Sequence, residues 1–453
     1  MKVKGTVLIL AYECYPFHRT GSTIGAQRPY QFAKNLSLLG WKVIVLCCDQ
    51  GKRRTLPRKQ MNRVVQETYT AHTDSLKNDA YTIIALPSLA FNGIGDYIWS
   101  RAVVNGPGGT YAGKPFPFSW VRKIFTFYNQ LKNGDYSWSW NPVANHLAEQ
   151  VIQDYKVDVL LGEHGPDAGI ILADALSRKY GIPWIADFRD PVLWPFKGIF
   201  KWLYKQKVKS IVKSSFATLN VTPYWTSLDQ KHFDKDAYTI VNGYDHELFE
   251  EIAPSHFPAF TISYYGSFNE EFQDIKPSLE AVSSFLKKLQ YPSDVKLFYR
   301  GLCNQQFLRC CQDAGIPEEY LDVDGFIERK AAIASMKGSD VLLIYSFPTY
   351  KARNIYEKKG FYPGKIFEYI GSGSPVLLIP SDEGILASLI QEQQKGLACS
   401  SVQEAVSFLE GQYTTWKNKR QVKRFAPTDR ALYSRYAQAL QLDKILSPYI
   451  RTH

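Results

Sequence analysis

The chain has 453 residues, of which 45% are hydrophobic and 21% charged, which suits a globular protein of about two or three compact domains. This composition excludes intrinsic disorder, collagen-like repeats and a small disulfide scaffold. The net charge of +11 fits nucleic acid, an acidic membrane surface or phosphorylated substrates, but without a zinc-finger or RNP-like motif nucleic acid is the least favoured partner.

Two further features bear on the compartment. The seven cysteines show neither a disulfide-framework spacing nor a zinc-binding CxxC pattern, so we expect reduced thiols. No apolar run approaches the roughly eighteen residues of a spanning helix, and residues 7–10 begin a strand and not a signal peptide. The sequence therefore predicts a cytosolic protein.

The first half of the chain alternates β-branched apolar runs with helical patterns. An apolar run at residues 7–11 is followed by a glycine-bearing loop at 12–25 and a helical pattern at 28–39, which Gly40 ends. Further strands are expected at residues 41–46, 81–87, 157–161 and 183–187, with helices at 142–155 and 168–180. This alternation predicts an α/β fold with a doubly wound parallel sheet.

A second alternation follows a polar, proline-bearing stretch at residues 245–258. Its strands are expected at residues 261–265, 295–299, 321–323, 340–344 and 375–379. We therefore predict two Rossmann-like domains facing across a cleft, an N-terminal acceptor-side domain (residues 1–250) and a C-terminal nucleotide-sugar domain (residues 251–428). Apolar residues at helical spacing predict that residues 429–453 form a closing helix that packs back toward the N-terminal domain.

The most informative segment is residues 362–377. Its Pro363-Gly364 pair opens a helix, which places Lys365 and free backbone N–H groups at the positive helix end, a natural seat for phosphate. Glu368 lies one turn further in, where a carboxylate can accept both hydroxyls of a ribose. Gly371 and Gly373 are expected to end the helix before the next strand.

This segment resembles the glycosyltransferases of the GT-B fold, specifically the retaining family 4 and group 1 transferases of bacterial surface polysaccharide synthesis. Those proteins carry a Lys-Leu-Phe-Glu-Tyr-Leu-like helix followed by a small-Gly-x-Pro-Val strand, which residues 365–376 match closely. Residues 157–166, 182–191, 241–245 and 262–267 also look like stretches of this family, in the family's order.

The resemblance implies transfer of a sugar from a nucleoside-diphosphate donor to a glycan or lipid-linked acceptor, without a metal or a further cofactor. Such transferases are thought to lack a strong enzymic nucleophile and to use front-face attack, so the protein would mainly position reactants and stabilise the departing diphosphate. Lys365 and Arg300 are the candidates for that stabilisation. The Asp-x-Asp pattern at Asp322 and Asp324 is read as chance and not as a metal site.

The remaining donor-site residues include matches and departures. Gly266 and Ser267 follow the first strand of the second domain and belong to a stretch that looks like the family's; Gly364 opens the later helix, and Lys365 begins its match to the family. The family usually has two glutamates separated by seven residues, but Gly360 stands eight before Glu368. The family's Arg and Lys after that first strand are not clearly present, so Arg300 and Lys365 are expected to supply the charge.

Candidates in the first domain follow predicted strands. Gly21 and Gly25 let backbone approach a pyrophosphate, although an ordinary flexible loop explains them equally well. His164 follows a strand end where the family often places a histidine near the sugar, and a structural histidine is equally consistent.

Asp187, Arg189 and Asp190 also stand at a strand end. They form either a buried Asp–Arg network that shapes the loop or a contact with acceptor and sugar. We favour the second reading because carboxyl strand ends collect function in such sheets.

Residues 194–216 contain six lysines and no acid, with apolar residues near helical spacing. A helix of this kind rests on an anionic bilayer, or it packs on its own sheet with a solvated basic face. The sequence does not separate the two, so peripheral association with the inner face of a membrane remains open.

Two alternatives to a transferase remain. A catalytically inactive scaffold that binds a glycan or a partner protein would explain the missing first glutamate. A sugar-nucleotide epimerase on the same fold would need its own carboxylate and histidine set, which we do not recognise in this sequence.

Overall fold

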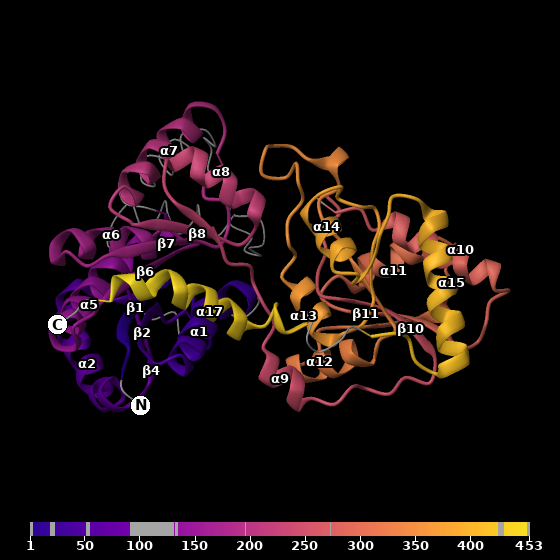
Figure 1. Ribbon diagram of the computed structural model, residues 1–453, viewed down its shortest axis with the longest axis horizontal. Helices are drawn as coiled ribbons and strands as arrows, with labels where there is room; N and C mark the ends of the chain where they lie inside the picture. Colours follow the sequence, from indigo (N-terminus) through magenta and orange to yellow (C-terminus); the bar gives the residue numbers. More distant parts are fainter. Residues whose placement is uncertain are drawn as a thin grey trace. The chain divides into compact units, whose positions relative to one another are not determined.

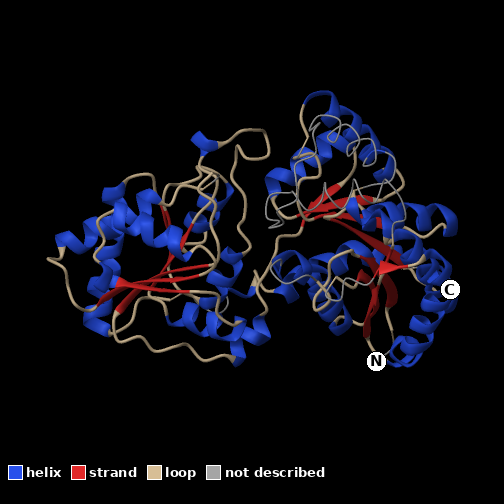
Figure 2. Cartoon of the chain, turned by 180° about the vertical axis from the view of Figure 1, so that it is seen from behind, coloured by secondary structure: helices blue, strands red, loops and turns tan. Residues whose placement is uncertain are grey.

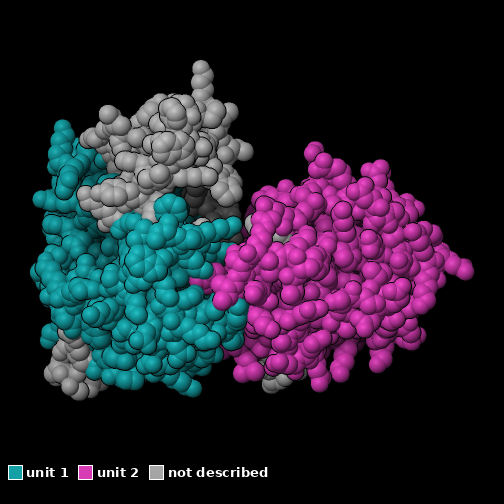
Figure 3. Space-filling view, turned by 90° about the horizontal axis from the view of Figure 1, so that it is seen from above, with its two compact units in different colours: residues 1–240, 439–453 teal, residues 241–438 magenta. Residues whose placement is uncertain are grey.

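In the computed structural model of the protein, the described residues are 3–18, 23–50, 55–90, 131, 135–194, 196–271, 273–424 and 430–450. The chain divides into two compact units, coloured separately in Figure 3. Unit 1 comprises Met1–Ile240 and Ala439–His453, and unit 2 comprises Val241–Gln438. The division lies ten residues before the 250/251 boundary set by the sequence pattern, and the polar stretch that follows it contains α9 (His246–Glu251).

Over the described residues, unit 1 is built on a seven-stranded parallel sheet in the order β4-β2-β1-β6-β7-β8-β9. Its strands are β1 (Gly5–Leu10), β2 (Trp41–Cys48), β4 (Tyr81–Leu86), β6 (Val159–His164), β7 (Trp184–Phe188), β8 (Ala217–Asn220) and β9 (Ala237–Thr239). A short parallel pair joins β3 (Thr55–Leu56) to β5 (Ser88–Leu89). All residues of β1 are buried, as expected for a central parallel strand covered on both faces.

Helices surround this sheet in Figure 1. They are α1 (Thr23–Leu38), α2 (Met61–Asn78), α5 (Asn141–Tyr155), α6 (Ala168–Tyr180), α7 (Gly198–Val212) and α8 (Pro223–Phe233), with the 3₁₀ turns η1 (Arg58–Gln60) and η2 (Tyr136–Ser139). The strand order reverses between β1 and β6, and the carboxyl ends of strands at such a switch point are where open α/β sheets bind ligands.

The C-terminal helix α17 (Arg435–Leu446), followed by η5 (Ser447–Tyr449), joins the core of unit 1. Ala439, Leu442 and Leu446 are fully buried in the same apolar cluster as the strands β1 and β2. The Asp443 carboxylate accepts a hydrogen bond from Trp41 Nε1 at 2.7 Å. The end of the chain therefore packs on the unit that its beginning forms, and Figure 1 shows α17 in yellow along that sheet.

Unit 2 contains a six-stranded parallel sheet over its described residues, in the order β12-β11-β10-β13-β14-β15. The strands are β10 (Phe260–Tyr265), β11 (Val295–Arg300), β12 (Leu321–Asp324), β13 (Val341–Ile344), β14 (Val376–Leu378) and β15 (Gly396–Ala398). The helices besides α9 are α10 (Lys276–Lys288), α11 (Asn304–Asp313), α12 (Arg329–Gly338), α13 (Lys365–Ser372), α14 (Ile385–Glu392) and α15 (Val402–Lys419), with η3 (Glu318–Tyr320) and η4 (Thr349–Lys351). Figure 2 shows the strands of each unit inside a layer of helices.

The two sheets confirm the α/β class and the two doubly wound parallel sheets expected from the sequence.

Each of the seven cysteines lies in the described part of the chain and is unpaired. Within the described residues, no helix combines the length and apolar character needed to cross a bilayer.

Candidate functional site

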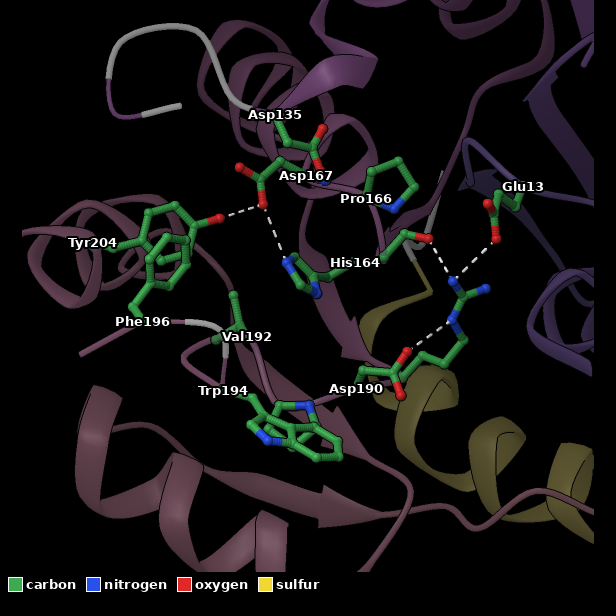
Figure 4. Close-up of a pocket in the computed structure, with 13 residues that line it drawn as sticks. Glu13, Asp135, His164, Pro166, Asp167, Asp190, Val192, Trp194, Phe196 and Tyr204 are labelled. Carbon is green, nitrogen blue, oxygen red and sulfur yellow. Dashed lines mark hydrogen bonds and ion pairs between the residues drawn. The ribbon is translucent and has the colours of Figure 1, made fainter. Parts of the chain in front are cut away.

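A pocket of ≈ 560 Å³ lies in unit 1 at the carboxyl ends of β1, β6 and β7. Figure 4 shows its side chains converging from the loops after these strands and from α7. The lining residues are Glu13, Asp135, His164, Gly165, Pro166, Asp167, Arg189, Asp190, Pro191, Val192, Trp194, Phe196 and Tyr204. The pocket therefore combines carboxylates with aromatic and apolar side chains.

His164, the last residue of β6, belongs to a hydrogen-bonded cluster at one side of the pocket. Its Nε2 lies 3.1 Å from Asp167 Oδ1, and the same oxygen accepts a hydrogen bond from the Tyr204 hydroxyl (Figure 4). Lys207 Nζ lies 3.8 Å from the other Asp167 oxygen. Burial opposes ionisation of Asp167, but His164 and Lys207 outweigh it, so the pKa of this carboxyl is lowered.

The second nitrogen of His164 takes no part in this cluster. A neutral imidazole that donates from Nε2 to Asp167 would carry its lone pair on Nδ1. Among the described residues it is buried without a hydrogen-bond partner. The His164 side chain is 12% exposed and lines the pocket, but Nδ1 itself has almost no exposed surface.

Asp135 supports the cluster from the segment before α5. Its carboxylate accepts hydrogen bonds from Asp167 N at 3.1 Å and Ser137 N at 3.0 Å. Burial, together with the negative charge of Asp167, raises the pKa of Asp135 to about 6. The pair Asp135 and Asp167 thus holds the loop between β6 and α6 in place.

Arg189 forms the opposite side of the pocket. Its Nη2 donates to Glu13 at 3.1 Å and to the Gly165 carbonyl at 2.6 Å, while its Nε lies 3.5 Å from Asp190. Burial works against the charge of Arg189, but the carboxylates of Glu163, Asp190 and Glu13 more than offset this and raise its pKa. The guanidinium is therefore already neutralised by the protein.

Glu163 completes this group and carries no signal in the sequence that marks it. It lies in β6 with 2% side-chain exposure, and its Oε1 is 3.8 Å from Arg189 Nη1. Burial raises its pKa well above the usual range, and Arg189 only partly opposes this.

The glycine expected near a pyrophosphate has another role in this structure. A Cβ on Gly25 would lie 2.2 Å from Arg189 Nη1, so the guanidinium fills the space that the missing side chain leaves. Gly165, at φ +117°, makes room for the same group, since a Cβ there would lie 2.9 Å from Nη2. Gly21 lies outside the described residues.

Asp187 lies behind the pocket and not in it. Its two oxygens accept hydrogen bonds from Arg28 Nε at 2.7 Å and Nη2 at 2.9 Å, and both side chains are almost fully buried. Arg28 Nη1 also donates to the Ile240 carbonyl at 3.0 Å. Arg28 thus ties α1 to β7 and to Ile240. The structure therefore places Asp187 in a buried network, and it places Arg189 and Asp190 at the pocket.

In unit 2, Lys365 lies at the first turn of α13. Its Nζ donates to the Tyr264 hydroxyl at 2.6 Å, lies 3.3 Å from the Ser267 carbonyl, and sits 4.1 Å from the centre of the Tyr264 ring. Burial lowers the pKa of Lys365 to about 7, and the charge of Glu368 only partly opposes this. A ligand anion bound next to the Lys365 amine would raise its pKa again and favour the protonated form.

The loop after β10 lies next to this lysine. Gly266 has φ +99°, donates its N–H to the Arg300 carbonyl at 2.7 Å, and leaves room for Lys365, since a Cβ would lie 3.1 Å from Nζ. Gly364 is the N-cap of α13, whose first N–H groups point out of the helix. The structure thus brings Gly266, Ser267, Gly364 and Lys365 together.

Glu368 and Arg300 have partners of their own. Glu368 Oε1 lies 3.1 Å from Arg329 Nη2, at the start of α12. Arg300 Nη2 lies 2.8 Å from Asp322 Oδ1, and its Nη1 donates to the Asp322 carbonyl at 2.7 Å. A ligand would have to compete with Asp322 for Arg300. Among the described residues, no cluster of His, Cys, Asp and Glu has the arrangement of a metal site.

The structure gives a physical reason for Gly360 at the position of the absent glutamate. Gly360 has φ +69°, and a Cβ there would lie 2.0 Å from Asp382 Oδ2. The fully buried Asp382 carboxylate accepts hydrogen bonds from Gly384 N at 3.1 Å, Leu386 N at 3.2 Å and Ala387 N at 2.9 Å, which caps α14. A carboxylate thus occupies this place but belongs to the helix cap.

Comparison with known proteins finds solved structures only, since no protein-family model and no curated protein matches the chain. A glycosyltransferase from Rickettsia africae ESF-5 aligns with a TM-score of 0.55 and 13% identity over 99% of both chains. Sucrose-phosphate synthase from Thermosynechococcus elongatus gives 0.54 and 12% over 97% of this chain and 98% of that one. HepE from Anabaena, solved with UDP-glucose, gives 0.53 and 12% over 98% and 99%. The chain therefore has the two-domain GT-B fold of these proteins.

Proposed function

We propose that the protein is a glycosyltransferase that moves a sugar from a nucleoside diphosphate to a glycan or lipid-linked acceptor. The observation that carries this proposal is Lys365, a half-buried ammonium at the start of α13 beside the Gly266 loop. The fold supports it, because HepE has the same fold and was solved with UDP-glucose.

The donor diphosphate is the anion that Lys365 would bind. The first N–H groups of α13 and the positive end of its dipole favour a phosphate at the same point, and Gly266 lets backbone approach closely. Glu368 lies one helical turn further along, where its carboxylate would accept the ribose hydroxyls. Arg300 would contribute only if Asp322 released it.

The unit 1 pocket fits a sugar acceptor. Its carboxylates neutralise Arg189, which disfavours a phosphate there and favours a neutral molecule rich in hydroxyl groups. The His164 ring lines the pocket, and Trp194 and Phe196 offer apolar surface for a sugar ring.

Transfer by this protein would break the bond between the anomeric carbon and the phosphate oxygen and form one to the acceptor oxygen. We propose, from the family resemblance, front-face attack with retention, in which the acceptor proton passes to the departing diphosphate. Lys365 would stabilise the charge that develops there without a metal ion. The biological role proposed with it is cell-surface polysaccharide synthesis in the cytoplasm, at the inner face of the membrane.

An inactive scaffold is the second candidate, and the Gly360–Asp382 contact favours it because the family's first carboxylate is absent. Both readings can be tested by incubating the protein with UDP-glucose, UDP-N-acetylglucosamine, GDP-mannose and dTDP-glucose and measuring nucleoside diphosphate release. We expect release from one donor, lost in Lys365→Met and kept in the matched control Lys287→Met on the exposed face of α10. Binding of a donor without any release would favour the scaffold.

A further inference from the structure

Helix α7 (Gly198–Val212) has two different faces. Tyr204, Val208, Ile211 and Val212 are buried against unit 1. On the other side, large apolar side chains remain exposed, with Ile199 at 62% and Trp202 at 56%. The helix therefore packs on its own sheet and still exposes apolar surface.

The exposed face is also basic. Ile199, Trp202, Gln206, Lys209 and Lys213 follow one another at spacings of three and four residues, which places them in one stripe. Lys205 precedes Lys209 by one helical turn and lies beside this stripe. Residues 194–216 contain no aspartate or glutamate. Burial, assisted by the charges of Lys205 and Lys201, lowers the pKa of the neighbouring His232 to about 4.

We propose that this stripe docks the protein on a bilayer that carries anionic lipid. Ile199 and Trp202 would enter the boundary between headgroups and acyl chains, and Lys205, Lys209 and Lys213 would lie over lipid phosphates. An exposed aromatic and aliphatic pair next to lysines without acids is the pattern of a helix lying in the interface plane, where each lysine adds attraction to anionic lipid.

The position of the helix links this surface to the pocket. Tyr204, on the buried face of α7, lines the pocket, and Phe196, two residues before the helix begins, does the same. A bilayer at the stripe would thus lie next to the pocket wall. Resting on the proposed transferase function, this favours an acceptor whose sugar is carried on a lipid.

Flotation with lipid vesicles tests the surface directly. We expect the full chain to float with vesicles of phosphatidylcholine and phosphatidylglycerol at low salt, and to stay unbound with phosphatidylcholine alone. The double variant Lys205→Gln/Lys209→Gln should bind on the order of tenfold more weakly, since each lysine contributes near an anionic surface. The control Lys59→Gln/Lys77→Gln removes the same charge from exposed positions elsewhere in unit 1 and should bind as wild type.

A second readout reports the apolar contact. Lipids brominated in the acyl chain should quench part of the tryptophan fluorescence, and Trp202→Phe should lose that part while other tryptophans remain. Equal binding of both lysine double variants, or no binding to anionic vesicles, would overturn the proposal. UDP-induced thermal stabilisation, measured without vesicles, should be the same in all these variants, so a failure of docking is distinguishable from a failure of the donor site.

Discussion

The pocket of unit 1 and the lysine site of unit 2 differ in how far carboxylates compensate their positively charged side chain. Arg189 lies beside the carboxyl groups of Glu13, Glu163 and Asp190, and the carboxylates of Glu13 and Asp190 compensate its charge within the protein. Lys365 instead faces the Tyr264 ring and a carbonyl, and burial lowers its pKa. Ion pairs neutralise the first site before a ligand arrives. In the second, Glu368 acts on Lys365, but among the described residues no carboxylate forms an ion pair with it. This difference supports our proposal that the sugar acceptor binds unit 1 and the diphosphate binds unit 2.

The largest effect is expected from the ion pair that supports the unit 1 pocket. Asp187→Ala leaves the Arg28 guanidinium buried without its carboxylate, which should cost about 3–5 kcal/mol of unfolding free energy. Urea denaturation followed by fluorescence measures this. The exposed pair of Lys179 and Glu149 is the control, and Glu149→Ala should cost under about 1 kcal/mol. A stable Asp187→Ala protein would mean that the pair does not hold α1 on β7.

The next effect belongs to unit 2. Lys365→Met removes the ammonium but keeps the aliphatic stem, so nucleoside diphosphate binding should weaken by about 2–3 kcal/mol, or roughly 30- to 150-fold. Isothermal titration calorimetry with the nucleotide that binds wild type measures it. Lys287→Met serves as the control, and unchanged affinity in Lys365→Met would remove this lysine from the donor site.

The pKa of Lys365 gives a prediction without ligand. Its folded value of about 7 lies below its ordinary value of 10.5, so between these pH values the unfolded chain binds more protons. The contribution of Lys365 to stability should therefore rise with pH across this window. Denaturation midpoints of wild type and Lys365→Met, compared from pH 7 upward, should diverge in favour of wild type. A constant difference would show that the lysine is charged in the folded protein.

A smaller effect is expected at the position of the absent glutamate. Gly360→Ala forces a Cβ against Asp382 at φ +69°, which should cost about 1–3 kcal/mol of stability. Gly181 has a similar φ of +64° with nothing within 4 Å, so Gly181→Ala isolates the backbone strain from the clash. Equal losses in both variants, measured by thermal unfolding, would mean that Asp382 does not fill this place.

The smallest effect is expected at the rim of the pocket. Asp190 is 61% exposed and lies 3.5 Å from Arg189 Nε, so Asp190→Asn should change stability by under about 1 kcal/mol. Glu13→Gln, at 14% exposure, removes a more buried partner of the same guanidinium and should cost more. The reverse order in thermal unfolding would show that the exposed carboxylate does most of the neutralising.

The sequence predicted the two sheets because parallel strands leave apolar runs of fixed length between helical patterns, as at residues 7–11 and 261–265. The start of α13 was also predictable, because Pro363-Gly364 opens a helix locally. The pairing of Arg28 with Asp187 was not, since the two stand 159 residues apart and nothing local marks them. For the same reason the roles of Glu13 and Asp135 follow only from the assembled pocket.

The most direct test of the charge assignment is a thermal-shift series with UDP, GDP, CMP and dTDP on wild type, Lys365→Met, Glu368→Ala and Lys287→Met. A ligand that binds only the folded state raises the melting temperature by mass action. We predict that one nucleotide stabilises wild type and Lys287→Met, and that both Lys365→Met and Glu368→Ala lose this shift. Stabilisation that survives both substitutions, or that no nucleotide produces, would contradict the assignment of the diphosphate to unit 2.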